Sequence, residues 1–250
     1  RVPGHRGAAM IRVYPDPESL SRAAAVLLVS QANLAVAHRG RFSVALSGGT
    51  TPRRTYELLA APPFLDQAPW DRMHVFWGGV RCVPLDDPRS NARMAKAAWL
   101  DRVPIPTGQI HPLDCARAPA AAARQYEAQL REFFAGRPPH LDLVLLGLGD
   151  NGHTASLFPG TPVLEETRRW AAAVYVAEAD LNRVTLTAPF INQAMVVAFL
   201  VAGSSKAGVL YEVLHGPRDP ARLPAQLIQP QNGEVLWLID QEAAALVPAT

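Results

Sequence analysis

The feature that most constrains the fold is a regular alternation of short apolar segments with amphipathic, helix-like ones. Apolar runs with the length and composition of buried strands occur at 42–46, 73–77, 141–146, 195–201 and 235–240. Segments with apolar residues at helical spacing lie between or beside them, at 17–37, 52–60, 118–134, 188–193 and 204–214. Apolar strands joined by helices pair in parallel, with helices covering both faces of the sheet. The sequence therefore predicts an open, mostly parallel α/β sheet.

The length of the chain is compatible with a single hydrophobic core. Its 250 residues contain no internal repeat and no low-complexity linker, and 49% of them are hydrophobic, as in ordinary soluble globular proteins. We expect one α/β domain over residues 10–250. Residues 1–9 are polar and aperiodic, and we interpret them as a leader or a cloning remnant outside the fold.

Charge and hydropathy limit the classes of partner. The chain has 24 basic and 22 acidic residues and a formal net charge of +2, whereas nucleic-acid binders usually carry a clear basic excess. No uninterrupted apolar run approaches the roughly 20 residues that cross a bilayer. We therefore expect neither nucleic acid nor a membrane as a partner. Only Lys96 and Lys206 among the basic residues are lysines, a ratio that compositional bias explains.

The two cysteines bear on the compartment. Cys82 and Cys115 lie far apart in the sequence and lack the spacing of a metal site. One disulfide between them is an open alternative, but we favour two reduced thiols in a cytoplasmic protein. No metal is expected.

Three glycine-rich turns follow predicted strands, and ligands of open α/β sheets bind at the carboxyl ends of strands. The first turn contains Ser47, Gly48, Gly49 and Thr50 and leads into a predicted helix. Its glycines let the backbone approach a ligand, and the free N–H groups of the helix start favour an anion. A phosphate cradle is one interpretation, and a plain tight turn with a hydroxyl cap is the other.

The second turn, 147–152, formally matches the GxGxxG pattern of dinucleotide sites. That pattern requires a helix directly afterwards, whereas prolines and a glycine interrupt the chain at 159–162, so we disfavour a dinucleotide. The turn instead presents His153, whose position at a strand exit suits proton transfer. The remaining histidines are interpreted as leader, surface or structural residues: His5, His38, His74, His111, His140 and His215.

The third turn, 203–207, places Lys206 in the first turn of a predicted helix. The helix dipole disfavours a cation at that position unless an anion is nearby. Lys206 is therefore a candidate ligand for a negatively charged group, with a solvated surface lysine as the alternative.

Together these motifs resemble the family of glucosamine-6-phosphate isomerases and 6-phosphogluconolactonases over nearly the whole span 11–240. The matching stretches are 45–52, 81–84 with 90–91, 147–159 and 203–207, of which GHTASLFP at 152–159 is the most specific. The resemblance implies a Rossmann-like fold and a single catalytic domain. It also implies hydrolysis of 6-phospho-D-glucono-1,5-lactone, a small phosphorylated sugar lactone, to 6-phosphogluconate in the pentose phosphate pathway. No metal or cofactor is implied, and a monomer and a dimer remain equally open.

The resemblance also implies roles for individual residues. His153 is similar to a general base that activates water, and an imidazole with a pKa near 6.5 suits that task. Arg81 and Lys206 resemble phosphate ligands. The loop formed by Ser47, Gly48, Gly49 and Thr50 would line the sugar phosphate.

Three positions depart from the family pattern. The family usually has Asp-Gly-His where this chain has Asn151 before Gly152 and His153, and Gly-Asp-Glu-Arg where it has Gly79 and Val80 before Arg81. An asparagine accepts a hydrogen bond but cannot stabilise an imidazolium by charge, and in serine proteases the corresponding change costs about 10⁴ in turnover. Two alternatives therefore stay open. One is a catalytically impaired sugar-phosphate-binding homologue, and the other, less favoured because 154–159 is lactonase-like, is a sugar-phosphate isomerase or deaminase.

Overall fold

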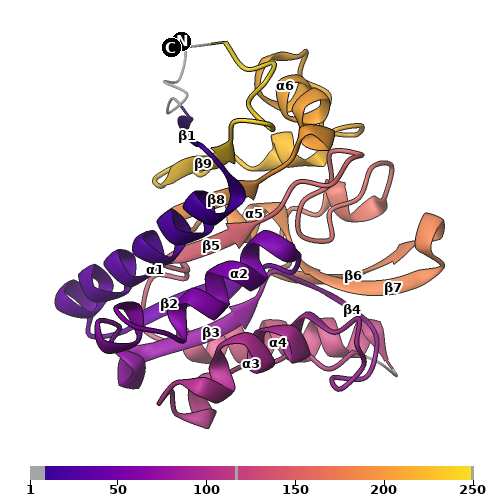
Figure 1. The fold of residues 1–250 in the computed structure, drawn as a ribbon. Helices are drawn as coiled ribbons and strands as arrows, with labels where there is room; N and C mark the ends of the chain where they lie inside the picture. Colours follow the sequence, from indigo (N-terminus) through magenta and orange to yellow (C-terminus); the bar gives the residue numbers. More distant parts are fainter. Residues whose placement is uncertain (1–8, 116–117, 249–250) are drawn as a thin grey trace.

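The computed structural model describes residues 9–115 and 118–248, and its centre is a parallel sheet. In these residues the sheet has six strands in the order β1-β9-β8-β5-β2-β3, each paired in parallel with its neighbours (Figure 1). The strands are β1 (Met10–Tyr14), β2 (Phe42–Leu46), β3 (Met73–Trp77), β5 (Leu143–Leu146), β8 (Val196–Val201) and β9 (Glu234–Asp240). The predicted fold class, an open and mostly parallel α/β sheet, is confirmed. The expectation of a leader at 1–9 falls on residues 1–8 outside the described part of the chain.

The helices divide between the two faces of this sheet. They are α1 (Pro17–Arg39), α2 (Thr50–Leu59), α3 (Asn91–Ala98), α4 (Pro119–Phe133), α5 (Ala188–Ile191) and α6 (Ala207–His215). Helices α1 and α2 lie side by side against one face (Figure 1). Each connects a strand to a later strand that lies nearer the β3 edge of the sheet. The crossovers through α4, α5 and α6 step in the opposite direction, so right-handed crossovers carry these helices to the other face.

Helix α1 shows how local sequence fixes an element. The Asp16 carboxylate accepts a hydrogen bond from the Ser19 amide at 2.7 Å, Pro17 opens the first turn, and Gly40 ends the helix with a φ of 78°. Among the described residues α1 also has the length and hydropathy of a membrane span, which corrects the expectation of no such segment. Its Leu20 and Ala24 are buried against the sheet in the manner of a core helix.

A second, antiparallel sheet was not predicted from the sequence. It consists of β4 (Gly79–Arg81), β7 (Leu181–Leu186) and β6 (Ala171–Val176), in the order β4-β7-β6. Its strands escaped prediction because β4 has only three residues and pairs with a hairpin about a hundred residues later. Helix α3, capped by the Ser90 hydroxyl, was also missed, and the helix expected from 204 begins with a 3-10 turn (Ser204–Lys206).

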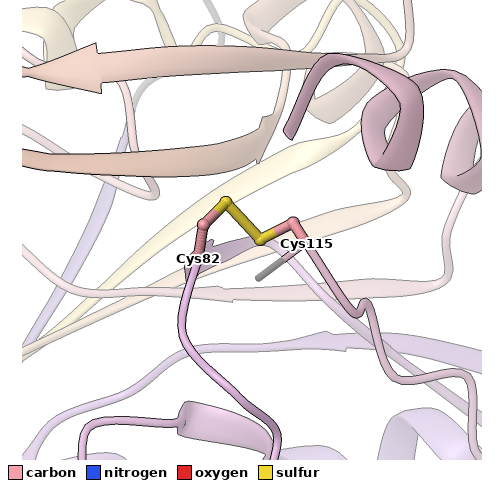
Figure 2. The surroundings of a disulfide bond; sticks show 2 residues. All are labelled: Cys82 and Cys115. Carbon is pink, nitrogen blue, oxygen red and sulfur yellow. A yellow bond between two sulfur atoms is a disulfide. The ribbon is translucent and has the colours of Figure 1, made fainter. Parts of the chain in front are cut away.

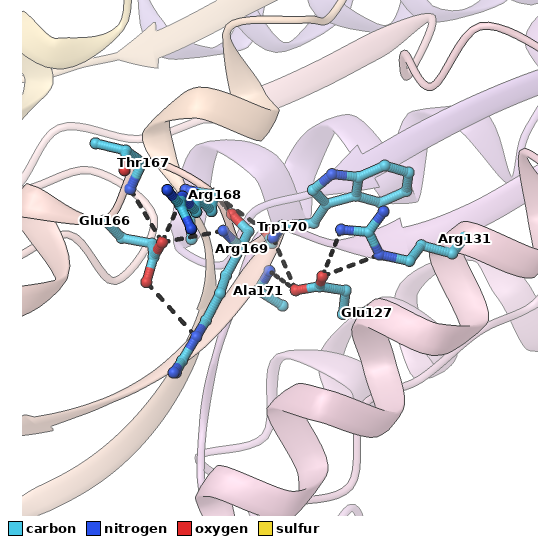
Figure 3. Close-up of polar contacts among 9 residues, drawn as sticks. Glu127, Arg131, Glu166, Thr167, Arg168, Arg169, Trp170 and Ala171 are labelled. Carbon is cyan, nitrogen blue, oxygen red and sulfur yellow. Dashed lines mark hydrogen bonds and ion pairs between the residues drawn. The ribbon is translucent and has the colours of Figure 1, made fainter.

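The hairpin of β6 and β7 is anchored to α4 by Glu127. One carboxylate oxygen of Glu127 accepts the amides of Trp170 at 2.8 Å and Ala171 at 3.4 Å, and the other accepts two hydrogen bonds from Arg131 (Figure 3). Burial alone would raise the pKa of Glu127, but these hydrogen bonds outweigh it and lower the pKa. The Arg131 guanidinium also lies 4.2 Å above the Trp170 ring. The start of the hairpin is therefore fixed by a charged group that is fully hydrogen-bonded.

The cysteines form a disulfide, so the preference for two reduced thiols is wrong in this structure. Cys82 directly follows β4, and Cys115 ends the segment that leaves the bridge between Val75 and Ile110 (Figure 2). Their Cα atoms are 4.8 Å apart, within the range that a disulfide spans. The two cysteines are 33 residues apart in the sequence, so their proximity was not evident from it. They meet because one follows β4 and the other follows the segment that pairs with β3.

Replacing Cys82 by serine is expected to lower the free energy of unfolding by about 3 to 4 kcal/mol, because the bond restricts a long loop of the unfolded chain. Urea denaturation of wild type and Cys82→Ser without reductant measures the difference. Dithiothreitol should bring the wild type to the stability of the variant and leave the variant unchanged. A wild type that titrates with two free thiols would contradict the disulfide.

Candidate active site

The candidate site lies where the chain changes direction along the sheet. The turn after β2 leads to α2 on one face, and the turn after the neighbouring β5 leads to segments of the other face, so a crevice opens between them. A cavity of about 350 Å³ occupies this crevice. Six of the predicted site residues line it: Ser47, Gly48, Gly49, Arg81, His153 and Lys206. Thr50 opens α2 beside the cavity, and Asn151 contacts His153 without lining it.

The turn after β2 is held rigid by neighbours on both sides. The buried Tyr56 hydroxyl donates to the Ser47 carbonyl at 2.8 Å and accepts from the Ser47 amide at 3.1 Å. A Cβ atom at Gly48 would lie 2.2 Å from the Asn91 side chain, and Gly49 has a φ of 107°. The backbone conformation at Gly49 therefore favours glycine, and a side chain at Gly48 would displace Asn91. The turn presents the N-terminus of α2, a ten-residue helix, to the cavity.

The hydrogen bonds of His153 fix its tautomer. The Asn151 Oδ1 atom accepts the His153 amide at 3.1 Å and lies 2.6 Å from His153 Nδ1. An atom that accepts from a backbone amide is the oxygen of the side-chain amide, so the ring proton resides on Nδ1 and Nε2 keeps its lone pair. The ring stacks on Phe158 at 4.1 Å between centroids, and it passes so close to Gly149 that a Cβ there would lie 2.0 Å from Nδ1.

The environment of His153 keeps the imidazole neutral. Burial lowers its pKa, and the positive charges of Arg183, Lys206 and Arg81 lower it further, while Asp150 acts in the opposite direction. The resulting pKa is about 4. At neutral pH the ring is therefore an unprotonated base, which is the form that can accept a proton from water.

Three cations surround the cavity, and sequence reasoning missed one of them. Arg81 on β4 stands opposite Arg183 on β7 in the antiparallel register, and Lys206 enters from the turn after β8. Burial and the neighbouring Arg81 lower the pKa of Arg183 to about 10, and its buried Nε atom has no hydrogen-bond partner. An anion between these groups would compensate their charge. Arg183 escaped prediction because it lies on the unpredicted hairpin.

The contacts of the cations show what holds each in place. Lys206 Nζ lies 2.6 Å from Oδ1 of Asp150, an exposed carboxylate that the motif analysis did not single out. Arg81 donates to the Arg89 carbonyl at 3.2 Å and to the Asn91 side chain at 3.5 Å. The carboxylate on Lys206 is solvent-exposed, so an incoming anion can displace it at small cost.

The two neutral positions of β4 are packed rather than empty. Val80 is buried in the main hydrophobic core. A Cβ atom at Gly79 would lie 2.9 Å from the amide and the hydroxyl of Ser156. A carboxylate at Gly79 would displace the turn that carries Ser156, and one at Val80 would be buried in the hydrophobic core. The structure therefore has no room for an acidic side chain at Gly79 and an apolar environment at Val80.

None of the other described histidines lines this cavity. His74 and His111 stack on each other at 5.6 Å between ring centroids, in a cluster with Phe76 and Phe133. Burial, the charge of His111 and that of Arg41 lower the pKa of His74 to about 4. His140 lines two other cavities, and His5 lies outside the described residues.

Fold and cavity together define an α/β protein with a cavity that three cations line beside a neutral histidine. A family model described as glucosamine-6-phosphate isomerases/6-phosphogluconolactonase matches residues 15–237. A 6-phosphogluconolactonase from Synechocystis sp. is 46% identical over 241 residues, which covers 94% of this chain and 97% of that protein. Its counterpart from Nostoc sp. is 45% identical over 240 residues, covering 94% and 97%. The chain belongs to the glucosamine-6-phosphate isomerase/6-phosphogluconolactonase family.

Solved structures agree with this assignment. The 6-phosphogluconolactonase from Trypanosoma brucei superimposes with a TM-score of 0.84 at 29% identity, over 97% of this chain and 100% of that one. A monomeric glucosamine-6-phosphate deaminase has a TM-score of 0.78 at 22% identity, over 95% of this chain and 99% of that one. The second likeness shows the shared fold.

The contact between Asn151 and His153 leads to a prediction. Asn151→Asp is expected to raise the pKa of His153 by about 1 to 3 pH units from its value of about 4, because a carboxylate 2.6 Å from Nδ1 favours the imidazolium. NMR titration of the His153 ring protons measures the pKa. The exposed Asn232→Asp serves as the charge-matched control and should leave it unchanged. An unchanged pKa in Asn151→Asp would show that Asn151 does not face the ring as described.

Proposed function

We propose that the protein hydrolyses 6-phospho-D-glucono-1,5-lactone to 6-phosphogluconate. The observation that carries the proposal is a neutral, oriented histidine within one cavity with three cations. The chain is 46% identical, over 94% of its length, to a relative with this enzyme's name. The enzyme would be a carboxylic ester hydrolase that acts on a lactone.

The cations would hold the phosphate of the substrate. A phosphate monoester carries close to two negative charges at neutral pH, and Arg81, Arg183 and Lys206 supply three positive ones around the cavity. Binding would transfer Lys206 from the exposed Asp150 to the phosphate and provide a partner for the unpaired Nε of Arg183. The phosphate lies far from the reacting carbonyl, so these contacts contribute binding energy and orient the ring.

The base would act on water. Nε2 of His153 accepts a proton from a water molecule while the water oxygen adds to the lactone carbonyl carbon and forms a tetrahedral oxyanion. Backbone N–H groups of the glycine-rich turns supply donors for that oxyanion. The intermediate collapses with cleavage of the bond between the carbonyl carbon and the ring oxygen. The ring oxygen takes the proton from the imidazolium, which yields the open carboxylic acid and restores the base.

Asn151 and Asp150 would together replace the aspartate that the family usually has two residues before the histidine: one orients the ring and the other supplies the negative charge. The Asn151 oxygen holds the Nδ1 proton and thereby directs Nε2 to the water. Asp150 adds a negative charge that favours the transient imidazolium. Orientation is thus retained while the direct ion pair is lost, which is consistent with a slower but active enzyme.

The reaction needs neither metal nor cofactor, because a base and oxyanion donors suffice for water addition to an activated ester. In the described part of the chain no group of three or more His, Cys, Asp or Glu side chains has the arrangement of a metal site. We further propose that the protein is a monomer or dimer and acts on its sugar lactone without nucleic-acid or membrane partners. We also propose a cytoplasmic location, in which the Cys82–Cys115 disulfide is of an uncommon kind.

The neutral Asn151 favours a second candidate, a catalytically impaired protein that binds sugar phosphates. That protein would bind 6-phosphogluconate through the same three cations without turning over the lactone. An isomerase or deaminase activity has only the shared fold in its favour.

The hydrolase proposal predicts faster loss of freshly prepared 6-phosphogluconolactone with enzyme than in the blank. His153→Ala should reduce kcat by about 10² to 10⁴, because the base is removed. Formation of 6-phosphogluconate, coupled to its dehydrogenase, measures the rate. The exposed His38→Ala is the control and should keep the wild-type rate. Calorimetric binding of 6-phosphogluconate with no rate above the blank would instead establish the impaired binder.

Arg183→Ala is expected to raise KM more than it lowers kcat, because Arg183 contacts the remote phosphate in both ground and transition states. Loss of a hydrogen bond to a charged group, about 1.5 to 3 kcal/mol, corresponds to roughly a tenfold to hundredfold change. The exposed Arg168→Ala, which removes the same charge near the start of the same hairpin, should leave KM unchanged. Equal KM values for the two variants would exclude Arg183 from the phosphate site.

A further inference from the structure

A second cavity lies at the opposite end of the sheet. It has a volume of about 260 Å³ and sits at the amino ends of β2 and β5, where α1 ends and the chain leaves α4. Three arginines line it, Arg39, Arg41 and Arg137. Ser43 faces this cavity and Ser47 faces the active-site cavity, so the two lie about 13 Å apart along β2.

The single carboxylate that lines this second cavity is already saturated. Asp142 Oδ1 accepts two hydrogen bonds from Arg39, at 3.1 and 2.7 Å. Its Oδ2 accepts the amide of Ser43 at 2.8 Å and the Ser43 hydroxyl at 3.1 Å. Asp142 therefore neutralises Arg39 and fastens β5 to β2, and it leaves the other two guanidinium groups without a direct carboxylate partner.

Arg41 and Arg137 are held in place by neutral groups. Arg41 donates to the Phe133 carbonyl at 2.7 Å and lies 3.7 Å from the centroid of the Phe133 ring, and Arg137 donates to the Arg39 carbonyl at 3.3 Å. Neither forms an ion pair with a carboxylate among residues 9–115 and 118–248. Burial, followed by the charge of Arg137, lowers the pKa of Arg41, while the charge of Asp142 acts in the opposite direction. Contacts with helix-end carbonyls explain where the two side chains lie, but the lining still holds three arginines and only one carboxylate.

A larger cavity of about 530 Å³ adjoins the arginine cavity, and His140 lines both. Its lining contains no Asp, Glu, Lys or Arg and is rich in amides: Asn192, Gln193, Gln229, Gln231 and Asn232. Asn192 holds the surrounding loop, since its side chain donates to Leu227 and accepts from the Gln229 amide. The side-chain amides of Gln193, Gln231 and Asn232 make no hydrogen bond to other described residues, so they are free to bind a ligand.

We propose that these two cavities form a second ligand site for a small phosphate ester. The phosphate lies between Arg41 and Arg137 and supplies the negative charge that the protein lacks there. The uncharged body of the ester, rich in hydroxyl or amide groups, lies in the amide-lined cavity and hydrogen-bonds the free side chains. The site is separate from the catalytic cavity and shares no lining residue with it.

Equilibrium dialysis with inorganic phosphate tests the arginine half of the site. The measurement uses Lys206→Ala/Arg183→Ala protein, in which the catalytic cavity has lost two of its cations. Adding Arg137→Ala should weaken phosphate binding at least about tenfold. Adding Arg124→Ala, which removes an exposed arginine of α4, should not. Equal binding in the two triple variants would overturn the proposal. Arg137→Gln, which keeps most of the side-chain packing, provides the same comparison if the alanine variant fails to fold.

Two phosphate esters test the amide-lined cavity and show which chemical class the uncharged part of the ligand belongs to. Adenosine monophosphate and glucose 6-phosphate are compared with inorganic phosphate in the same Lys206→Ala/Arg183→Ala protein. At least one ester should bind tighter than phosphate, and Gln193→Ala should abolish that gain while leaving inorganic phosphate binding unchanged. Tighter binding of the nucleotide identifies a nucleoside body, and tighter binding of glucose 6-phosphate identifies a sugar. If neither ester binds tighter than phosphate, the proposed two-part site is wrong.

Discussion

The pairing of β2 with β5 is the contact on which the rest of the structure depends. The two strands share only the register pairs of Val44 with Leu143 and Ala45 with Val144. At their amino ends, Ser43 and Asp142 reinforce the pairing through four hydrogen bonds, three of them donated by backbone amides. At their carboxyl ends the chain departs toward opposite faces of the sheet, which leaves the crevice of the catalytic cavity. A short strand contact thus creates a cavity at each of its ends.

The small antiparallel sheet completes the proposed catalytic cavity from outside the main sheet. Because β4 and β7 pair with Arg81 opposite Arg183, two guanidinium groups are brought together that repel each other in the absence of an anion. The fold tolerates this repulsion because the hairpin is fixed elsewhere, by Glu127 on the amides of Trp170 and Ala171 and by the Cys82 disulfide beside Arg81. These anchors keep the two guanidinium groups close together, in an arrangement that suits a phosphate.

The site also shows how a histidine can remain oriented without a carboxylate on its ring. Asn151 supplies the acceptor oxygen. The nearby negative charge belongs instead to Asp150, which is exposed and paired with Lys206. Burial among cations then lowers the pKa of His153 to about 4 and keeps the ring neutral. A phosphate at Lys206 would change the charge balance around both Asp150 and His153, so substrate binding and the basicity of the histidine are coupled in this arrangement.

The sequence by itself determined the parallel sheet, most helix and strand positions, and the turns that carry Ser47, His153 and Lys206. These features depend on apolar periodicity, capping residues and glycine positions, which act between neighbours along the chain. Only the tertiary structure decided the partnership of Arg183 with Arg81, the bond between Cys82 and Cys115, and the packing that closes over Gly79. The cysteines are 33 residues apart in the sequence, and Arg183 lies 183 − 81 = 102 residues after Arg81. No local pattern records which distant segments will meet. Local physics specified the elements and the turns, whereas long-range packing determined which charged groups face one another across the site.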